Sequence, residues 1–381
     1  MTDPCIALLR TLVAIDSVNP SLVPGARGEA AMAEAVAAHM RALGLSVHIE
    51  HVVPSRPNVV GVLEGSAPGP SLMYCGHIDT VGTEGMQAPF SADIRDGRLY
   101  GRGSQDMKGG VAAMIDAARV AQERGFNRGR LIVAAVIDEE YASLGADALV
   151  RTWRADAAVV TEPTDLQIGV GHKGFAWIEV ETRGRAAHGS RPREGRDAIL
   201  RMGRVLRRLE ELDRSLQARP PHPIMATASL HASTIRGGHE WSIYPDRCVL
   251  QVERRTVIGE SAAMAEQEVL AILDELRQQD PEFSGSAALV FARSAYQTPP
   301  NHPLPIVLRE LSSRRAVDAA PVGMSFWTDA AILGDAGIPS VLFGPGGAGL
   351  HSVEEYVNVE DVLVCRDVLA ELALTWCGRL E

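Results

Sequence analysis

Strand and helix patterns alternate over about the first 170 residues of the chain. Residues 29–43 and 111–124 carry apolar positions at helical spacing, and the two patterns end at Gly44 and Gly125. Short apolar runs typical of buried strands occupy residues 58–63, 72–75, 131–137 and 157–160. Strands that alternate with helices favour an α/β fold with a mostly parallel sheet and helices on both of its faces.

The pattern changes near Gly174. From there the order is strand, helix, strand, strand, helix, strand, over residues 175–182, 196–216, 226–235, 248–252, 260–279 and 287–291. This order is typical of a ferredoxin-like α+β domain. The first pattern resumes after Ser294 and closes with a helix over residues 359–377. We therefore expect residues 174–293 to form a domain inserted into one made of residues 1–173 and 294–381.

Length and charge narrow the class of protein. A chain of 381 residues suits two domains, and a net charge of −11 argues against nucleic acid as a partner. No apolar run approaches the roughly 20 residues of a membrane span. Residues 1–16 contain no basic region followed by an apolar core, so we do not expect a signal peptide. The five cysteines are scattered without CxxC spacing, which favours a reducing compartment. We expect a cytoplasmic protein that binds neither membranes nor nucleic acids.

Histidines and acids follow several of the apolar runs. One isolated His-x-Asp is more often a strand-end turn with a buried histidine, but here the side chains form a set. Because the carboxyl ends of parallel strands meet at one edge of a sheet, we expect these side chains to lie together. Two histidines with several carboxylates favour a metal centre. The candidates are His77, Asp106, Glu139, Glu140, Glu162 and His351.

The adjacent acids Glu139 and Glu140 cannot both point the same way on an extended segment. One of them can therefore face a metal while its neighbour faces a water molecule. A two-metal hydrolytic site needs this division, because it requires ligands, a bridging carboxylate and a free acid to handle protons.

The motifs around these residues, in their order, resemble a known family. They are GHIDTV at 76–81, GRGSQDMKGG at 101–110, DEE at 138–140, TEPT at 161–164 and LHSVEEYV at 350–357. The chain resembles, over nearly its whole length, the dinuclear zinc hydrolases that include aminoacylase, acetylornithine deacetylase, succinyl-diaminopimelate desuccinylase and carboxypeptidase G. The resemblance implies a zinc-peptidase-like catalytic domain with an inserted lid and dimerisation domain, and hence a homodimer.

The resemblance also implies the metals and their ligands. We expect two divalent metal ions per chain, with zinc as the first choice and cobalt or manganese as alternatives. His77 and Glu162 are implied as ligands of one metal, and Glu140 and His351 as ligands of the other. Asp106 is implied as the bridge between them.

Five further residues receive roles from the resemblance. Asp79 would orient the ring of His77, and Glu139 would act as general base on a metal-activated water. In the inserted domain, His188 of an AHxSxP-like motif would reach the site of the other subunit and polarise the scissile carbonyl. Arg255 would bind the substrate carboxylate. Ser242 stands where many relatives have an asparagine that contacts substrate.

The implied activity is hydrolysis of the amide bond of N-acyl amino acids, as in acetylornithine deacetylase. A dipeptidase or a carboxypeptidase G-like exopeptidase uses the same metals and base and is the alternative. A non-catalytic metal-dependent binding protein is a remote alternative, and the intact Glu139 argues against it. Residues 344–349 satisfy the dinucleotide-binding pattern GxGxxG, but no strand with a ribose-binding acid can follow them, so a turn that presents His351 explains the glycines better.

Overall fold

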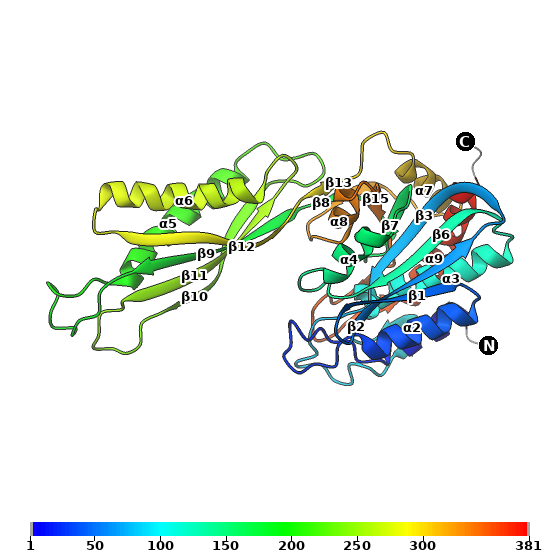
Figure 1. The fold of residues 1–381 in the computed structure, drawn as a ribbon, viewed down its shortest axis with the longest axis horizontal. Helices are drawn as coiled ribbons and strands as arrows, with labels where there is room; N and C mark the ends of the chain where they lie inside the picture. Colours follow the sequence, from blue (N-terminus) through cyan, green and yellow to red (C-terminus); the bar gives the residue numbers. More distant parts are fainter. Residues whose placement is uncertain (1–2, 379–381) are drawn as a thin grey trace. The chain divides into compact units, whose positions relative to one another are not determined.

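The computed structural model describes residues 3–378, and the chain divides into two compact units. The first unit contains the chain up to Val170, residues Thr298–Val322 and the chain from Thr328 onward. The second contains Gly171–Gln297 and Gly323–Trp327. Figure 1 shows the chain coloured along its sequence, with the elements labelled. None of the described helices is long and apolar enough to cross a membrane.

A mixed sheet organises the first unit. Its strands, in spatial order, are β1 (Ser46–Val53), β2 (Arg56–Glu64), β6 (Arg128–Val136), β3 (Ala67–His77), β7 (Ala157–Val160), β15 (Ser340–Leu342) and β8 (Ile168–His172). The central strands β6, β3, β7 and β15 pair in parallel. Antiparallel pairs flank them on both sides. The parallel centre is the part of the sheet that aligns several strand ends at one edge.

Helices cover both faces of this sheet, as the sequence predicts. Leu131, Val133 and Ala135 of β6 join one large apolar cluster, whereas Ile132 and Ala134 between them are equally buried but point to the opposite face. The helices of that cluster are α1 (Pro4–Val13), α2 (Ala30–Ala42), α3 (Gly109–Glu123), α7 (Leu304–Ser313) and α9 (Val359–Cys377). On the opposite face α4 (Leu144–Thr152) and α8 (Ala330–Asp335) pack against each other and against strands of the sheet.

A small antiparallel sheet lies in the first unit and was not predicted. Its order is β16 (Gly347–Ala348), β17 (Tyr356–Asn358), β5 (Arg98–Tyr100) and β4 (Asp93–Arg95). These strands have only two or three residues, which is too short for a periodic pattern in the sequence. Because Tyr100 pairs with Tyr356, the sheet joins the segment before Asp106 to the loop that carries His351.

The second unit has the order β9 (Gly174–Arg183), α5 (Ala198–Gln217), β10 (Ser229–Gly237), β11 (Arg247–Thr256), α6 (Ala262–Gln279) and β12 (Ser284–Arg293). Its sheet is antiparallel, with β10 at an edge and the order β10-β11-β9-β12. Asp197 and Ser261 cap α5 and α6 by accepting hydrogen bonds from main-chain N–H groups of the first turn. The predicted fold class, an α/β domain with a ferredoxin-like α+β insertion, is confirmed.

Two strands each begin in the first unit and end in the second. The boundary between the units falls within β8 and within β14 (Pro321–Met324). The short strand β13 (Tyr296–Gln297) pairs with the end of β8 inside the second unit. After residue 294 the sequence predicted one helix and one strand before the closing helix, whereas the structure also contains α8 and several strands of two to four residues.

Candidate metal centre

The ends of the parallel strands bring three candidate segments to one edge of the sheet. His77 is the last residue of β3, and its register partner on β6 is Val136. Glu139 and Glu140 lie in the turn that follows β6. Glu162 follows β7, whose Val160 lies beside Cys75 of β3. The alignment of strand ends therefore explains why these side chains converge.

Two connecting segments complete the cluster. Asp106 lies in the turn η1 (Ser104–Lys108) that precedes α3 and has a non-helical backbone there, and His351 lies in the loop between β16 and β17. Asp106 Oδ1 is 3.1 Å from His77 Nε2, and Asp106 Oδ2 is 3.3 Å from His351 Nε2. Glu140 Oε2 is 3.2 Å from the same His351 nitrogen. A carboxylate whose two oxygens face different imidazoles has the geometry to bridge two cations.

Two overlapping sets of side chains could each hold a metal ion. One consists of His77, Asp106 and Glu140, and the other of His77, Glu139 and Glu162, with the ligand atoms of each set within 4.8 Å of one another. Glu139 Oε2 lies 4.0 Å from His77 Nε2. The geometry thus gives Glu139 access to the same space as the ligands, as either a ligand or a base.

Two buried carboxylate oxygens of the centre accept no hydrogen bond from any described residue, as expected for atoms that bind a divalent cation. Among the described residues, none donates a hydrogen bond to Oε1 of Glu140 or to Oε1 of Glu162, although both atoms are buried. Unpaired carboxylate oxygens are costly in a dry site unless a cation or a proton balances them. Imidazole nitrogens and carboxylate oxygens suit zinc, cobalt and manganese. The residues present therefore fit divalent metal ions.

In the metal-free centre, bound protons compensate for the negative charges that lie close together. Burial lowers the pKa of His77, but the carboxylates of Asp106 and Asp79 outweigh it and raise that pKa well above its usual value. Asp106 and Glu140 raise the pKa of His351 to about 10. Burial and the negative charges nearby raise the pKa of Glu162 well above its usual value. The centre therefore holds protons at neutral pH that a metal ion must displace.

Asp79 holds the main chain of the acidic pair. Its Oδ1 accepts a hydrogen bond from the N–H of Glu139 at 3.1 Å, and its Oδ2 accepts one from the N–H of Glu140 at 3.2 Å. His77 Nδ1 lies 3.0 Å from the main-chain oxygen of Asp79 and 3.6 Å from its carboxylate. Asp79 is thus in contact with the His77 ring, and its carboxylate accepts hydrogen bonds from the main chain of the two glutamates.

A buried arginine that the sequence analysis missed, Arg56, is linked to Asp79 through the side chain of Asn19. Arg56 donates to both oxygens of Glu29 at 2.7 and 2.6 Å and to Asp138 Oδ1 at 2.7 Å. It also donates to Asn19 Oδ1 at 3.1 Å, and Asn19 Nδ2 in turn donates to Asp79 Oδ2 at 2.7 Å. This network links the acidic turn to the N-terminal segment through one guanidinium.

A further buried acid, Asp329, was also missed. It precedes helix α8 and is 2% exposed. Burial is the main cause of the raised pKa of Glu139, and the charge of Asp329 adds to it, as it does for Glu162. The available signal was an acid before a short apolar run, but a helix of six residues has no recognisable periodicity. Asp329 therefore adds negative charge that favours cations in the centre.

Comparison with known proteins identifies the family. The family model "Peptidase family M20/M25/M40" matches residues 73–375. An acetylornithine deacetylase of Myxococcus xanthus is 31% identical over 396 residues, with 99% of this chain and 100% of that protein covered. An N-formyl-4-amino-5-aminomethyl-2-methylpyrimidine deformylase of Bacillus subtilis (strain 168) is 30% identical over 411 residues, with 99% and 95% covered. The chain belongs to peptidase family M20/M25/M40.

Solved structures agree with this assignment at the level of fold. A dinuclear metal-binding peptidase of the M20 family from Bacillus subtilis superposes with a TM-score of 0.76 at 16% identity, with 99% of this chain and 98% of that chain covered. The predicted family is confirmed, and so is the prediction of a metal-dependent hydrolase that acts on amide bonds. The candidate ligand sets support divalent metal ions as its cofactors.

Two candidate residues of this M20 protein lie on neighbouring loops of the second unit. His188 follows β9 and is exposed, and it forms an isolated β-bridge with Ile243. Ser242 precedes Ile243 in the loop between β10 and β11, and its main-chain oxygen accepts a hydrogen bond from the N–H of Gly189 at 2.7 Å. The two loops therefore hold His188 and Ser242 close to each other, on a unit separate from that of the metal ligands.

Arg255 lies on β11, on the sheet face opposite to the helices. Its guanidinium forms an ion pair with Glu253 and lies over the ring of Phe175, at 5.6 Å from the centroid. Trp177 donates to the other oxygen of Glu253 at 3.1 Å. Because its side chain remains 31% exposed, Arg255 can still receive an anion from solvent.

We expect zinc to bind more tightly as the pH rises from about 6 to about 8. In the metal-free centre the pKa values of His77, His351 and Glu162 are raised, so their protons oppose zinc, and this opposition weakens as the pH increases. Isothermal titration calorimetry in buffers of different ionisation enthalpy measures the affinity and counts the protons released.

The replacement His351→Asn should reduce both the affinity and the number of protons released. The matched replacement of an exposed histidine of the second unit, His231→Asn, should change neither. An affinity that falls with rising pH, or binding without proton release, would contradict this description of the centre.

Proposed function

We propose that this M20 protein is a dinuclear zinc hydrolase that removes the acyl group from N-acyl amino acids. The observation that carries the proposal is the position of Asp106, whose two oxygens face two different histidines. The acetylornithine deacetylase at 31% identity, which this chain matches over 100% of its length, supports a deacylase. Cobalt and manganese are the alternatives to zinc. The five cysteines are free and buried, which supports a reducing compartment such as the cytoplasm.

The proposed ligands divide between two sites. His77 and Glu162 hold one metal, Glu140 and His351 hold the other, and Asp106 bridges them. Bound zinc ions supply Lewis acidity, which lowers the pKa of water and polarises a carbonyl group. The side chains of this protein supply the positioning and the transfer of protons.

Glu139 is proposed as the general base. Asp79 fixes its main chain through the hydrogen bond to its N–H, so its carboxylate has a defined direction. Burial and the charge of Glu162 raise the pKa of Glu139, which makes it a better proton acceptor. Its carboxylate takes a proton from the attacking water and delivers it to the nitrogen of the leaving amine.

Replacing Glu139 by glutamine keeps the shape of the side chain and removes the base. We expect Glu139→Gln to lower kcat at least ~100-fold, the lower range for general acid–base catalysis, with the zinc content unchanged. The control Glu34→Gln, at an exposed position of α2, should retain full activity. Turnover of Glu139→Gln near that of the unaltered enzyme would remove the residue from this role, and a loss of zinc would indicate a ligand instead.

An exopeptidase that cleaves dipeptides or C-terminal residues is the second candidate. The family description as a peptidase favours it, and it would use the same ligands and base. Rates on matched pairs of N-acetyl amino acids and dipeptides separate the two candidates. A deacylase hydrolyses the acetyl compounds faster, whereas a preference for dipeptides would favour the exopeptidase.

Arg255 is proposed to bind the free carboxylate of the substrate. Its planar guanidinium can donate two parallel hydrogen bonds to a carboxylate, and the ring of Phe175 lies beneath it. Ser242 is proposed to contact the substrate where relatives have an asparagine. Ser242 is exposed on its loop, where a substrate can reach its hydroxyl group.

The enzyme should prefer an N-acyl amino acid over the corresponding amide. The charge-assisted hydrogen bond is worth about 1.5–3 kcal/mol, so kcat/KM should differ at least about tenfold. The replacement Arg255→Met should abolish this preference, whereas Arg207→Met, at an exposed position of helix α5 in the same unit, should retain it. Equal efficiency on acid and amide in the unaltered enzyme would assign Arg255 to another role.

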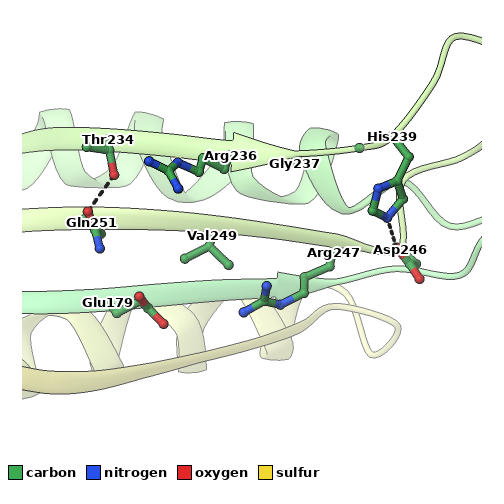
Figure 2. Close-up of a pocket in the computed structure, with 10 residues that line it drawn as sticks. Glu179, Thr234, Arg236, Gly237, His239, Asp246, Arg247, Val249 and Gln251 are labelled. Atoms are coloured by element: carbon green, nitrogen blue, oxygen red, sulfur yellow. Dashed lines mark hydrogen bonds and ion pairs between the residues drawn. The ribbon is translucent and has the colours of Figure 1, made fainter.

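The second unit is proposed to serve as a lid and as the interface of a homodimer. The edge strand β10 is exposed over most of its length, and an unprotected edge can pair with another strand. Beside it, a groove of about 490 Å³ lies on the face opposite to the helices (Figure 2). Arg236 and Arg247 line this groove together with Glu179 and Asp246. Charges of both signs suit pairing with a second copy of the same surface.

In this dimer His188 is proposed to act on the substrate in the other subunit. It would donate a hydrogen bond to the oxygen of the scissile carbonyl as negative charge develops there. Mixing inactive His188→Ala chains with inactive Glu139→Gln chains tests this proposal. Mixed dimers combine one intact metal centre with one intact His188, so activity should recover to at most about half that of one unaltered dimer.

Subunit exchange must be measured independently in this experiment, for example by mass spectrometry of differently tagged chains. Absence of recovery despite complete exchange would show that His188 acts within its own chain or has no catalytic role. A protein that remains monomeric would contradict the proposed interface.

A further inference from the structure

An ion pair buried beside the metal centre has no role among those proposed above. Arg102 Nη1 lies 2.6 Å from Glu355 Oε2, and the two side chains are 3% and 0% exposed. Arg102 belongs to the motif that contains Asp106, and Glu355 to the motif that contains His351. The pair therefore joins two ligand-bearing segments that are 253 positions apart in the sequence.

The carboxylate of Glu355 organises the turn of Asp106. Its Oε2 accepts a hydrogen bond from the N–H of Gly103 at 3.0 Å, and its Oε1 accepts those of Gln105 at 2.9 Å and Asp106 at 3.2 Å. Together with Arg102, these donors engage both oxygens of the carboxylate. Glu355 is thus committed to the protein and acts through other residues rather than on a substrate.

The guanidinium of Arg102 reaches two further segments of the centre. Its Nε donates to the main-chain oxygen of Gly82 at 3.0 Å, in the segment that follows His77. Its Nη2 donates to the main-chain oxygen of Ser352 at 2.9 Å, directly after His351. One side chain therefore connects the three segments that carry His77, Asp106 and His351.

The backbone of His351 needs such support. Its φ is 57°, in the left-handed region that residues other than glycine rarely adopt. A conformation of this kind persists only where the surrounding contacts impose it. The hydrogen bond from Arg102 to Ser352 and the main-chain bond from the N–H of Gly101 to the oxygen of Glu355 fix the loop on the C-terminal side of His351.

We infer that Arg102 and Glu355 are positioning residues that set the separation of Asp106 and His351, and with it the affinity of the centre for metal ions. The inference rests on the proposed metal centre. Lysine at position 102 would keep the charge but could not donate in three directions from one plane. Glutamine at position 355 would place its own NH₂ donor against main-chain N–H groups, which now donate hydrogen bonds to the carboxylate.

The test measures zinc binding rather than activity. The variants Arg102→Lys, Glu355→Gln and Glu355→Asp are stripped of metal and titrated with Zn²⁺ in competition with a chromophoric chelator. We expect Arg102→Lys and Glu355→Gln to bind zinc about 10–100-fold more weakly, the usual loss for residues that orient ligands. Glu355→Asp, which retains the charge, should recover part of the affinity.

The exposed neighbour Glu354 provides the matched control. Glu354→Gln should bind zinc as the unaltered protein does. The visible spectrum of the Co²⁺-loaded proteins reports the coordination geometry and should change in Arg102→Lys but not in Glu354→Gln. Circular dichroism and thermal unfolding of the metal-free proteins select the variants that fold, and the two charge-conserving replacements are the ones expected to do so.

The possible outcomes separate the inference from the proposed function. Folded variants with unaltered zinc affinity and an unaltered cobalt spectrum would overturn the inference alone, and so would failure of both charge-conserving variants to fold, since the pair would then hold the whole fold. An unaltered protein that binds zinc but hydrolyses no acyl amino acid or dipeptide would overturn the proposed function alone. An unaltered protein that binds no zinc would overturn both.

Discussion

The concentration of negative charge at one partly buried edge of the sheet is the constraint on which the rest of the structure depends. Asp106, Glu139, Glu140 and Glu162 converge there, and carboxylates out of water repel one another unless cations or protons balance them. A parallel sheet brings such groups together because its strands end side by side. The fold therefore brings the carboxylates together, and divalent metal ions offset the repulsion between them.

Two buried arginines and their acidic partners, far apart in the sequence, both hold segments of this centre in place. Arg56, with Glu29 and Asp138, supports the acidic turn through Asn19 and Asp79. Arg102 and Glu355 support the turn of Asp106 and the loop of His351. Removing one partner of a buried ion pair leaves an unpaired charge and costs about 3–5 kcal/mol, so such pairs hold a single arrangement of the main chain.

Most of the fold and the convergence of the ligand candidates could be predicted from local sequence. The closing helix was predicted over residues 359–377, the bounds that α9 has, and each ligand candidate stands at the end of a recognisable strand or in a motif. The partners of Arg56 and Arg102 could not be predicted, since these contacts join segments remote in the sequence. The small sheet that connects Tyr100 with Tyr356 was missed because its strands are too short to show a pattern.

The number of zinc ions bound per chain tests the central claim most directly. The protein is loaded with excess zinc, dialysed gently and analysed for metal and protein concentration, alongside Asp106→Asn, which weakens the proposed bridge. The account predicts two zinc ions per chain in the unaltered protein and fewer in the variant. A stoichiometry that never exceeds one, even under added zinc, would contradict the dinuclear centre.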